Sequence, residues 1–93
     1  MPEIYKYANF QIETYTGPGS YQPGGFTVVT STGPSLLLNA IVIQTSGGYN
    51  AYAKNITSNQ FTIQVYSSGG TEVLSGTNLT NIVFTVLEFG YGY

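Results

Sequence analysis

Short β-forming runs alternate with clusters of Gly, Pro, Ser and Asn along the whole chain. The clearest run is residues 60–66, Gln-Phe-Thr-Ile-Gln-Val-Tyr, where apolar and polar side chains alternate with the period of a β-strand. Further strands are expected at 10–14, 26–30, 36–44, 49–53, 71–74 and 81–89, separated by turn residues at a spacing of roughly 8–12 residues. This spacing predicts an all-β fold, an antiparallel β-sandwich or jelly-roll-like domain of about six to seven strands.

The chain is long enough for one domain with one core. It has 93 residues, of which 42 % are hydrophobic and 15 % aromatic, whereas disordered chains are poor in hydrophobic residues. We therefore expect a single β domain over residues 1–93. Residues 1–9 are expected to form an N-terminal arm, and residues 89–93 a C-terminal tail in which aromatic residues alternate with Gly.

Two of the expected strands, 36–44 and 82–89, carry apolar side chains on both faces. A two-layer sandwich buries only one face of each strand, so the second face needs a cover. Three covers are open: the Gly- and Pro-rich loop 17–25, the N-terminal arm, or another subunit, which we favour because burial of apolar area drives association. The interface residues that we expect are Tyr5, Tyr7, Phe10, Val83, Leu87, Phe89, Tyr91 and Tyr93.

The chain lacks most of the side chains that carry protein chemistry. It has no His, Cys, Trp, Arg or Asp, and acid–base, nucleophilic and zinc chemistry rely largely on these residues. We expect a non-enzymatic protein with no catalytic residue, no metal site and no cofactor. The glutamates are expected to be surface charges, except Glu88, which lies among apolar residues. Glu88 is expected to pair with Lys54 or Lys6, or to face a subunit boundary.

The low charge indicates a protein that works inside an assembly. Only 6 % of the residues are charged, against about 25 % in a typical soluble domain, and a free small domain usually has a far more charged surface. No basic cluster is present for nucleic acid or an anionic membrane. Residues 1–6 lack the features of a secretory signal, so we expect an extracellular role to need another export route, such as release inside a virus particle.

Tyrosine is the residue type best suited to recognition here. Tyr49, Tyr52 and Tyr66 are candidates for stacking on sugars or on a protein partner, because Tyr offers a large contact area at a low entropy cost. Ordinary packing on a sheet face is the alternative, since Tyr is common in strands. Both interpretations remain open at this point.

The stretch 56–70, Ile-Thr-Ser-Asn-Gln-Phe-Thr-Ile-Gln-Val-Tyr-Ser-Ser-Gly-Gly, followed by the strand 82–89, resembles the second half of H-type-lectin-like modules in phage fibres. This resemblance implies a β-sandwich that forms trimers or hexamers and binds sugars near subunit edges. The overall composition is similar to that of small virion proteins that decorate or cement capsids. Because the chain has no Arg, Asp or His, sugar contacts would rely on the three tyrosines named above.

These observations together predict a structural protein of the virion, located on the particle surface. The expected role is that of a capsid decoration or cement subunit, which forms a homo-oligomer, with a trimer favoured. Its expected partner is the major capsid protein or another virion protein. Two alternatives are a glycan-binding module at a fibre tip, with carbohydrate as the partner, and a subunit of an extracellular filament.

Overall fold

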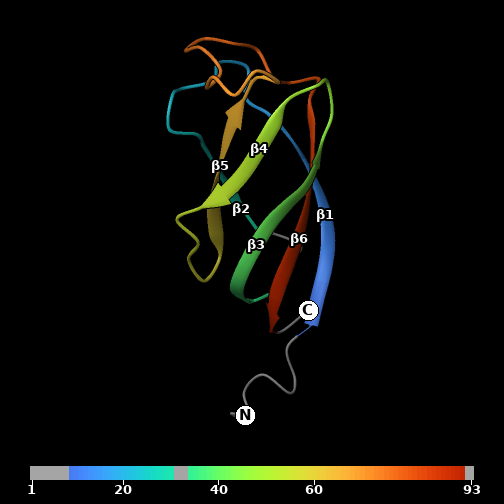
Figure 1. The fold of residues 1–93 in the computed structure, drawn as a ribbon. Helices are drawn as coiled ribbons and strands as arrows, with labels where there is room; N and C mark the ends of the chain where they lie inside the picture. The colour runs from blue at the N-terminus through green and yellow to red at the C-terminus, as the bar shows by residue number, and fades with distance from the viewer. Residues whose placement is uncertain (1–8, 31–33, 92–93) are drawn as a thin grey trace.

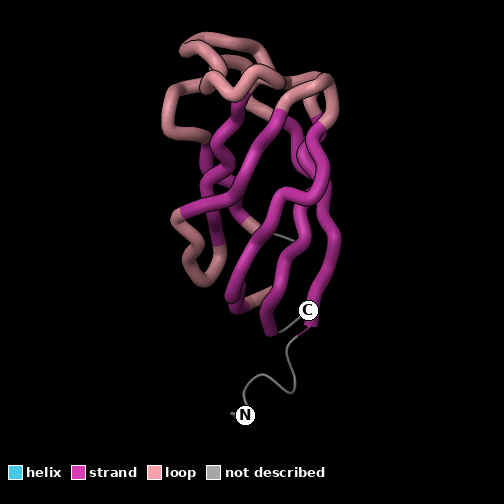
Figure 2. Tube along the Cα trace, in the orientation of Figure 1, coloured by secondary structure: helices cyan, strands magenta, loops and turns pink. Residues whose placement is uncertain are grey.

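The computed structural model describes residues 9–30 and 34–91, and this part of the chain is all-β. Six strands form two three-stranded sheets whose neighbours are antiparallel, which confirms the predicted β-sandwich. Figure 1 shows the strands running along the long axis of the molecule, and Figure 2 shows the loops gathered at the ends. The strands are β1 Asn9–Thr16, β2 Phe26–Val29, β3 Leu36–Thr45, β4 Asn50–Lys54, β5 Gln60–Tyr66 and β6 Val83–Tyr91.

The two sheets have the strand orders β1-β6-β3 and β2-β5-β4. The connection from β4 to β5 stays within one sheet, whereas the other connections cross between the sheets. Gly47 and Gly48 form a tight turn with φ of 71° and 79°. This turn joins β3 to β4 in the opposite sheet and is therefore not a hairpin between paired strands.

The core lies between β5 and β6, the central strands of the two sheets. Edge-to-face ring pairs connect the sheets, with centroid distances of 5.4 Å for Phe26–Phe84 and 5.9 Å for Tyr15–Phe61. Aromatic pairs of this geometry add to the stabilisation from buried area. The fully buried apolar side chains of the two central strands are Phe61, Ile63, Val65, Phe84 and Val86.

In β1 the apolar side chains point outward, although the sequence pattern suggests that they point into the core. Alternation in residues 10–14 is typical of a half-buried strand with its apolar residues inward. In the structure Phe10 and Ile12 are exposed, while Tyr15 lies opposite the buried Phe84 and its ring contacts Phe61. The register with β6 therefore turns Gln11 and Glu13 to the inner side, together with Tyr15, because directly opposed residues share a face.

The predicted strand at 71–74 does not form. Its backbone makes one isolated bridge, Tyr66 to Glu72, and otherwise belongs to a loop. At the C-terminal end the predicted tail is partly sheet, because β6 continues to Tyr91, which lies opposite Leu36. The predicted N-terminal arm, apart from Asn9 at the start of β1, lies outside the described residues.

Strand β3 was expected to be buried on both faces, and it is buried on one. Leu37 and Ala40 are in the core. Two register shifts, at Leu38 and at Ile43, interrupt the pairing of β3 with β6, and both of these residues are exposed. The Gly- and Pro-rich loop does not cover the exposed face of β3. Its Tyr21 is instead buried in the core, where the Tyr21 hydroxyl accepts a hydrogen bond from the Val65 N–H of β5.

Candidate functional site: an apolar face and a tyrosine pair

The outer side of the β1-β6-β3 sheet is apolar and exposed. Phe10 lies directly opposite Phe89, and Leu87 lies between Ile12 and Ile41 on the two neighbouring strands. The exposed fractions are 68 % for Phe10, 57 % for Ile12 and 51 % for Ile41. We call this surface the apolar face; its residues are Phe10, Ile12, Ile41, Val83, Leu87 and Phe89.

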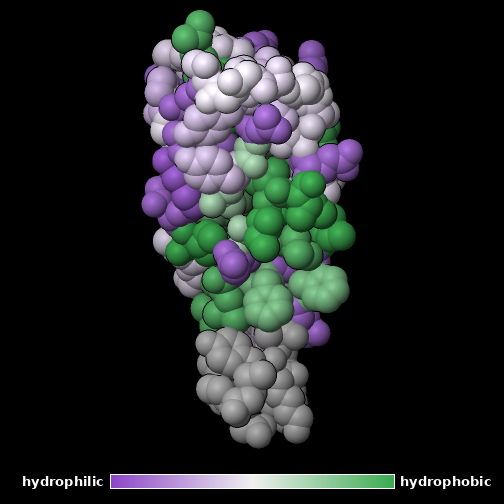
Figure 3. All heavy atoms as spheres, in the orientation of Figure 1, coloured by the Kyte–Doolittle hydropathy of each residue, from purple (hydrophilic) through white to green (hydrophobic). Residues whose placement is uncertain are grey.

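The apolar face is large for a protein of this size. With about 200 Å² for each large apolar side chain, the exposed fractions give on the order of 500 Å² of apolar surface. The largest such patch on a typical monomer is about 300–600 Å² and often has a function. Figure 3 shows hydrophobic residues gathered over this part of the molecule, while the loop end is more hydrophilic. A hollow of about 140 Å³ lies within the patch, lined by Asn39, Ile41, Leu87 and Phe89.

The structure brings four of the predicted interface residues onto this face: Phe10, Val83, Leu87 and Phe89. Tyr91 lies at the end of β6, and Tyr5, Tyr7 and Tyr93 lie outside the described residues. The sequence interpretation missed Ile12 and Ile41. Ile12 lies two residues after the predicted Phe10, on the same face of β1, and Ile41 lay in a run that was apolar throughout.

Charged groups of the described residues are absent from the apolar face. Glu13 and Glu88 are on the inner side of the same sheet, given the register of β1 with β6. Lys54 is on β4 of the other sheet, and Glu72 follows β5. A face without charge meets a copy of itself without repulsion between like charges.

Glu88 is buried inside the sandwich, with 0 % of its surface exposed. Its carboxylate accepts a hydrogen bond from the Tyr15 hydroxyl, and Gln11 donates to Glu13 close by on β1. Burial raises the pKa of Glu88, the hydrogen bond from Tyr15 lowers it, and the charge of Glu13 raises it further. The predicted pairing with Lys54 is wrong, because Lys54 lies opposite Thr62 in the other sheet; Lys6 lies outside the described residues.

Glu72 is also structural and not a simple surface charge. Its Oε2 accepts hydrogen bonds from the Gly24 backbone N–H at 2.7 Å, the Tyr21 hydroxyl at 2.8 Å and Gln64 Nε2 at 3.0 Å. These bonds, first among them the one from Gly24, lower the pKa of Glu72. The Tyr21 hydroxyl in turn accepts from the Val65 N–H at 3.0 Å, so Glu72 and Tyr21 tie two loops to β5.

The β2-β5-β4 sheet carries a pair of stacked tyrosines on its outer face. The rings of Tyr52 and Tyr66 are 5.7 Å apart between centroids and inclined by 18°. Their hydroxyl oxygens are 3.2 Å apart, and the Tyr52 hydroxyl donates to Gln64 Oε1 at 2.6 Å. The hydrogen bond with Tyr52, together with desolvation, raises the pKa of Tyr66 to about 12.

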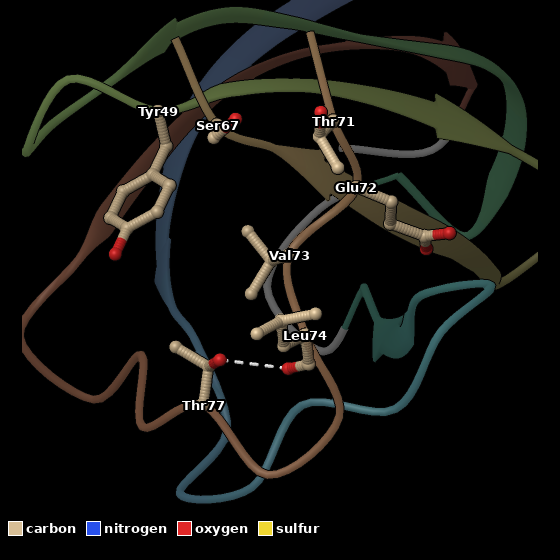
Figure 4. Close-up of a pocket in the computed structure, with 7 residues that line it drawn as sticks. All are labelled: Tyr49, Ser67, Thr71, Glu72, Val73, Leu74 and Thr77. Atoms are coloured by element: carbon tan, nitrogen blue, oxygen red, sulfur yellow. Dashed lines mark hydrogen bonds between the residues drawn. The ribbon is translucent and has the colours of Figure 1, made fainter. Parts of the chain in front are cut away.

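Tyr49, the third predicted stacking residue, lies elsewhere. It lines a pocket of about 340 Å³ at the loop end of the sandwich. Figure 4 shows its ring across the pocket from Val73 and Leu74, with the Glu72 side chain directed away. The pocket residues are Tyr49, Ser67, Thr71, Glu72, Val73, Leu74 and Thr77. Thus Tyr52 and Tyr66 form one surface, and Tyr49 belongs to another.

No protein-family model, curated protein or solved structure matches this chain. Within residues 9–30 and 34–91, no group of three or more His, Cys, Asp or Glu side chains is placed to hold a metal ion. The same residues contain no helix that is long and apolar enough to cross a membrane.

Proposed function

We propose that this protein is a non-enzymatic structural subunit that assembles with copies of itself through the apolar face. The observation that carries the proposal is the exposure of Phe10, Ile12 and Ile41 on one sheet face that no described residue covers. Within the assembly, the particular role that we propose is that of a decoration or cement protein on a virus capsid.

A second copy is the occupant that fits this face best. Homodimer interfaces are more apolar than other interfaces, and the apolar face has no charged side chain among the described residues. Burial of on the order of 500 Å² on each copy contributes about 12 kcal/mol per copy before costs. Loss of rotational and translational freedom costs about 4–15 kcal/mol, so the face is large enough to hold copies together.

The proposal of a virion setting is supported by the low charge of the chain and by its lack of His, Cys, Arg and Asp. With the apolar face buried between copies, the outer face of the β2-β5-β4 sheet and the loop end of the sandwich stay available for contact with the capsid. The terminal aromatic residues Tyr91 and Tyr93 are proposed to clamp a neighbouring protein. If purified virus particles from the source of this chain do not contain it, the virion role is contradicted while the self-assembly proposal stands.

Self-assembly is tested by measuring the solution mass of the full chain by light scattering. We expect a trimer, with three times the 10.0 kDa mass of one chain. The double variant Ile12→Thr/Ile41→Thr keeps β-branched side chains and is expected to be a folded monomer. The matched control is Val29→Thr, because Val29 is 55 % exposed on the other sheet. A monomeric wild type, or a double variant of unchanged mass, would contradict the proposal.

A second candidate function is carbohydrate binding on the outer face of the β2-β5-β4 sheet. It is favoured by Tyr52, which is 46 % exposed and lies beside Tyr66 and the amide of Gln64. Sugars bind proteins through ring stacking together with hydrogen bonds to such polar groups. A glycan titration followed by NMR is expected to perturb the wild type and Tyr49→Ala, but not Tyr52→Ala. Equal binding by both variants would exclude this surface.

A further inference from the structure

The two stacked tyrosines bring their reactive positions together. Tyr52 on β4 and Tyr66 on β5 have nearly parallel rings, and their hydroxyl oxygens are 3.2 Å apart. Each ring carbon ortho to a hydroxyl is bonded to the carbon that carries that oxygen. Close hydroxyls on near-parallel rings therefore place ortho carbons of the two residues next to each other. Proximity of this kind converts a bimolecular coupling into an intramolecular one.

The pair is also accessible, unlike the tyrosines of the interior. Tyr52 is exposed, and Tyr66 is half-buried on the outer face of the same sheet. Tyr21 is fully buried, and the hydroxyl of the half-buried Tyr15 bonds Glu88 on the inner side. Among the described residues, Tyr52 and Tyr66 are the two tyrosines whose rings contact each other. A diffusing oxidant can therefore reach it.

We propose that Tyr52 and Tyr66 form an oxidative cross-linking site that yields a dityrosine bond between β4 and β5. The oxidant is hydrogen peroxide acting through a haem peroxidase. Each phenol loses one electron to the oxidant and one proton to water. The two radicals couple through a new carbon–carbon bond between ortho carbons, and the two ring hydrogens move to the phenolic oxygens. The peroxide is reduced to two water molecules, so the protein loses two hydrogen atoms in total.

Such a bond supplies a covalent staple in a chain that has no cysteine. It closes the loop between residues 52 and 66 and thereby restricts the unfolded chain, as a disulfide does. The native strands already hold the two rings in contact, and the side chains turn from stacked to edge-to-edge as the rings regain aromaticity, because the final bond lies in the plane of both rings. We expect the cross-linked protein to unfold at a higher denaturant concentration. The inference is independent of the proposed assembly function.

The sequence makes the cross-link easy to detect. Its two basic residues are Lys6 and Lys54, so trypsin yields fragments 7–54 and 55–93, which contain Tyr52 and Tyr66 respectively. After treatment of the full chain at high dilution with peroxidase and peroxide, we expect these fragments to remain joined. The intact protein is expected to have the mass of one chain minus two hydrogen atoms, and to show dityrosine fluorescence.

Three variants locate the bond. Tyr52→Phe and Tyr66→Phe keep an aromatic ring in the stack but lack a phenol, so the joined product is expected to fall to background in both. Tyr49→Phe is the matched control, since Tyr49 lies in the same tryptic fragment as Tyr52, and it is expected to cross-link like the wild type. A joined product that persists in Tyr66→Phe overturns the assignment. So does a wild type that gives only covalent dimers, or that gives no product under conditions that couple free tyrosine.

Discussion

Replacement of Glu88 by Gln tests whether the interior carboxyl controls stability. Glu88 has no exposed surface and accepts a hydrogen bond from the Tyr15 hydroxyl. Its pKa is raised, chiefly by burial, so the folded protein binds a proton more tightly at this site than the unfolded chain does. The unfolded value is about 4.3. Above that pH, and up to the folded pKa, stability falls as the pH rises.

The size of the effect follows from the linkage relation. One proton held by the folded state and lost by the unfolded state changes the free energy of unfolding by about 1.4 kcal/mol per pH unit. Gln keeps the shape of Glu88 and can accept the same hydrogen bond, but it carries no charge. We expect Glu88→Gln to be more stable than the wild type at pH 7, and this difference to be smaller at pH 4, because the wild-type carboxyl binds its proton as the pH falls.

Urea unfolding at the two pH values, followed by circular dichroism, measures this difference. Glu72→Gln is a control of opposite sign: the pKa of Glu72 is lowered by its hydrogen bonds, so its contribution to stability is present at neutral pH and is lost as the pH falls. That variant is expected to be less stable than the wild type at pH 7. The reasoning on Glu88 fails if Glu88→Gln is less stable at pH 7, or if its difference from the wild type is the same at both pH values.

Two further substitutions test how the sheets and loops are held together. In Gly90→Ala the new Cβ meets a backbone oxygen of β3 and the ring of a buried proline, so we expect a loss of about 1–3 kcal/mol; Gly19→Ala, which meets nothing within 4 Å, is the control, and equal thermal midpoints for the two variants would contradict this expectation. Tyr21→Phe removes the acceptor of the Val65 N–H and a donor to Glu72. We expect it to lower the free energy of unfolding in urea by about 1–3 kcal/mol, and an unchanged value would show that this hydroxyl does not secure the loops.

The fold was predictable where local pattern and global packing agree. Residues 60–66 alternate cleanly, and β5 occupies the same residues, with Phe61, Ile63 and Val65 inside. In residues 71–74 the pattern also suggested a strand, but Glu72 is held by three hydrogen bonds in a loop conformation. Two of those partners, Tyr21 and Gly24, are distant in sequence, so no local pattern contained them.

The candidate surfaces were also predictable only in part, because the local pattern identified some of their residues and strand register places the others. The apolar faces of 36–44 and 82–89 indicated a surface that needs a cover, and Val83, Leu87 and Phe89 do lie on it. The contribution of Ile12 depends on the register of β1 with β6, and so does the inward direction of Glu13. The stacking of Tyr52 on Tyr66 likewise depends on the register of β4 with β5. Register depends on the hydrophobic patterns of both paired strands and on turn geometry, so the period within one strand does not fix it.

Thiol labelling is the most direct test of the claim that the apolar face is buried between copies. The chain has no cysteine, so one substitution introduces a single reporter. Thr14 is exposed on the outer side of β1, next to Ile12 along that face, and Thr27 is exposed on the outer side of the other sheet. In Thr14→Cys we predict that labelling is slow at concentrations where copies associate and becomes faster on dilution. In Thr27→Cys the rate should not depend on concentration. Equal rates in the two variants at all concentrations would contradict the account.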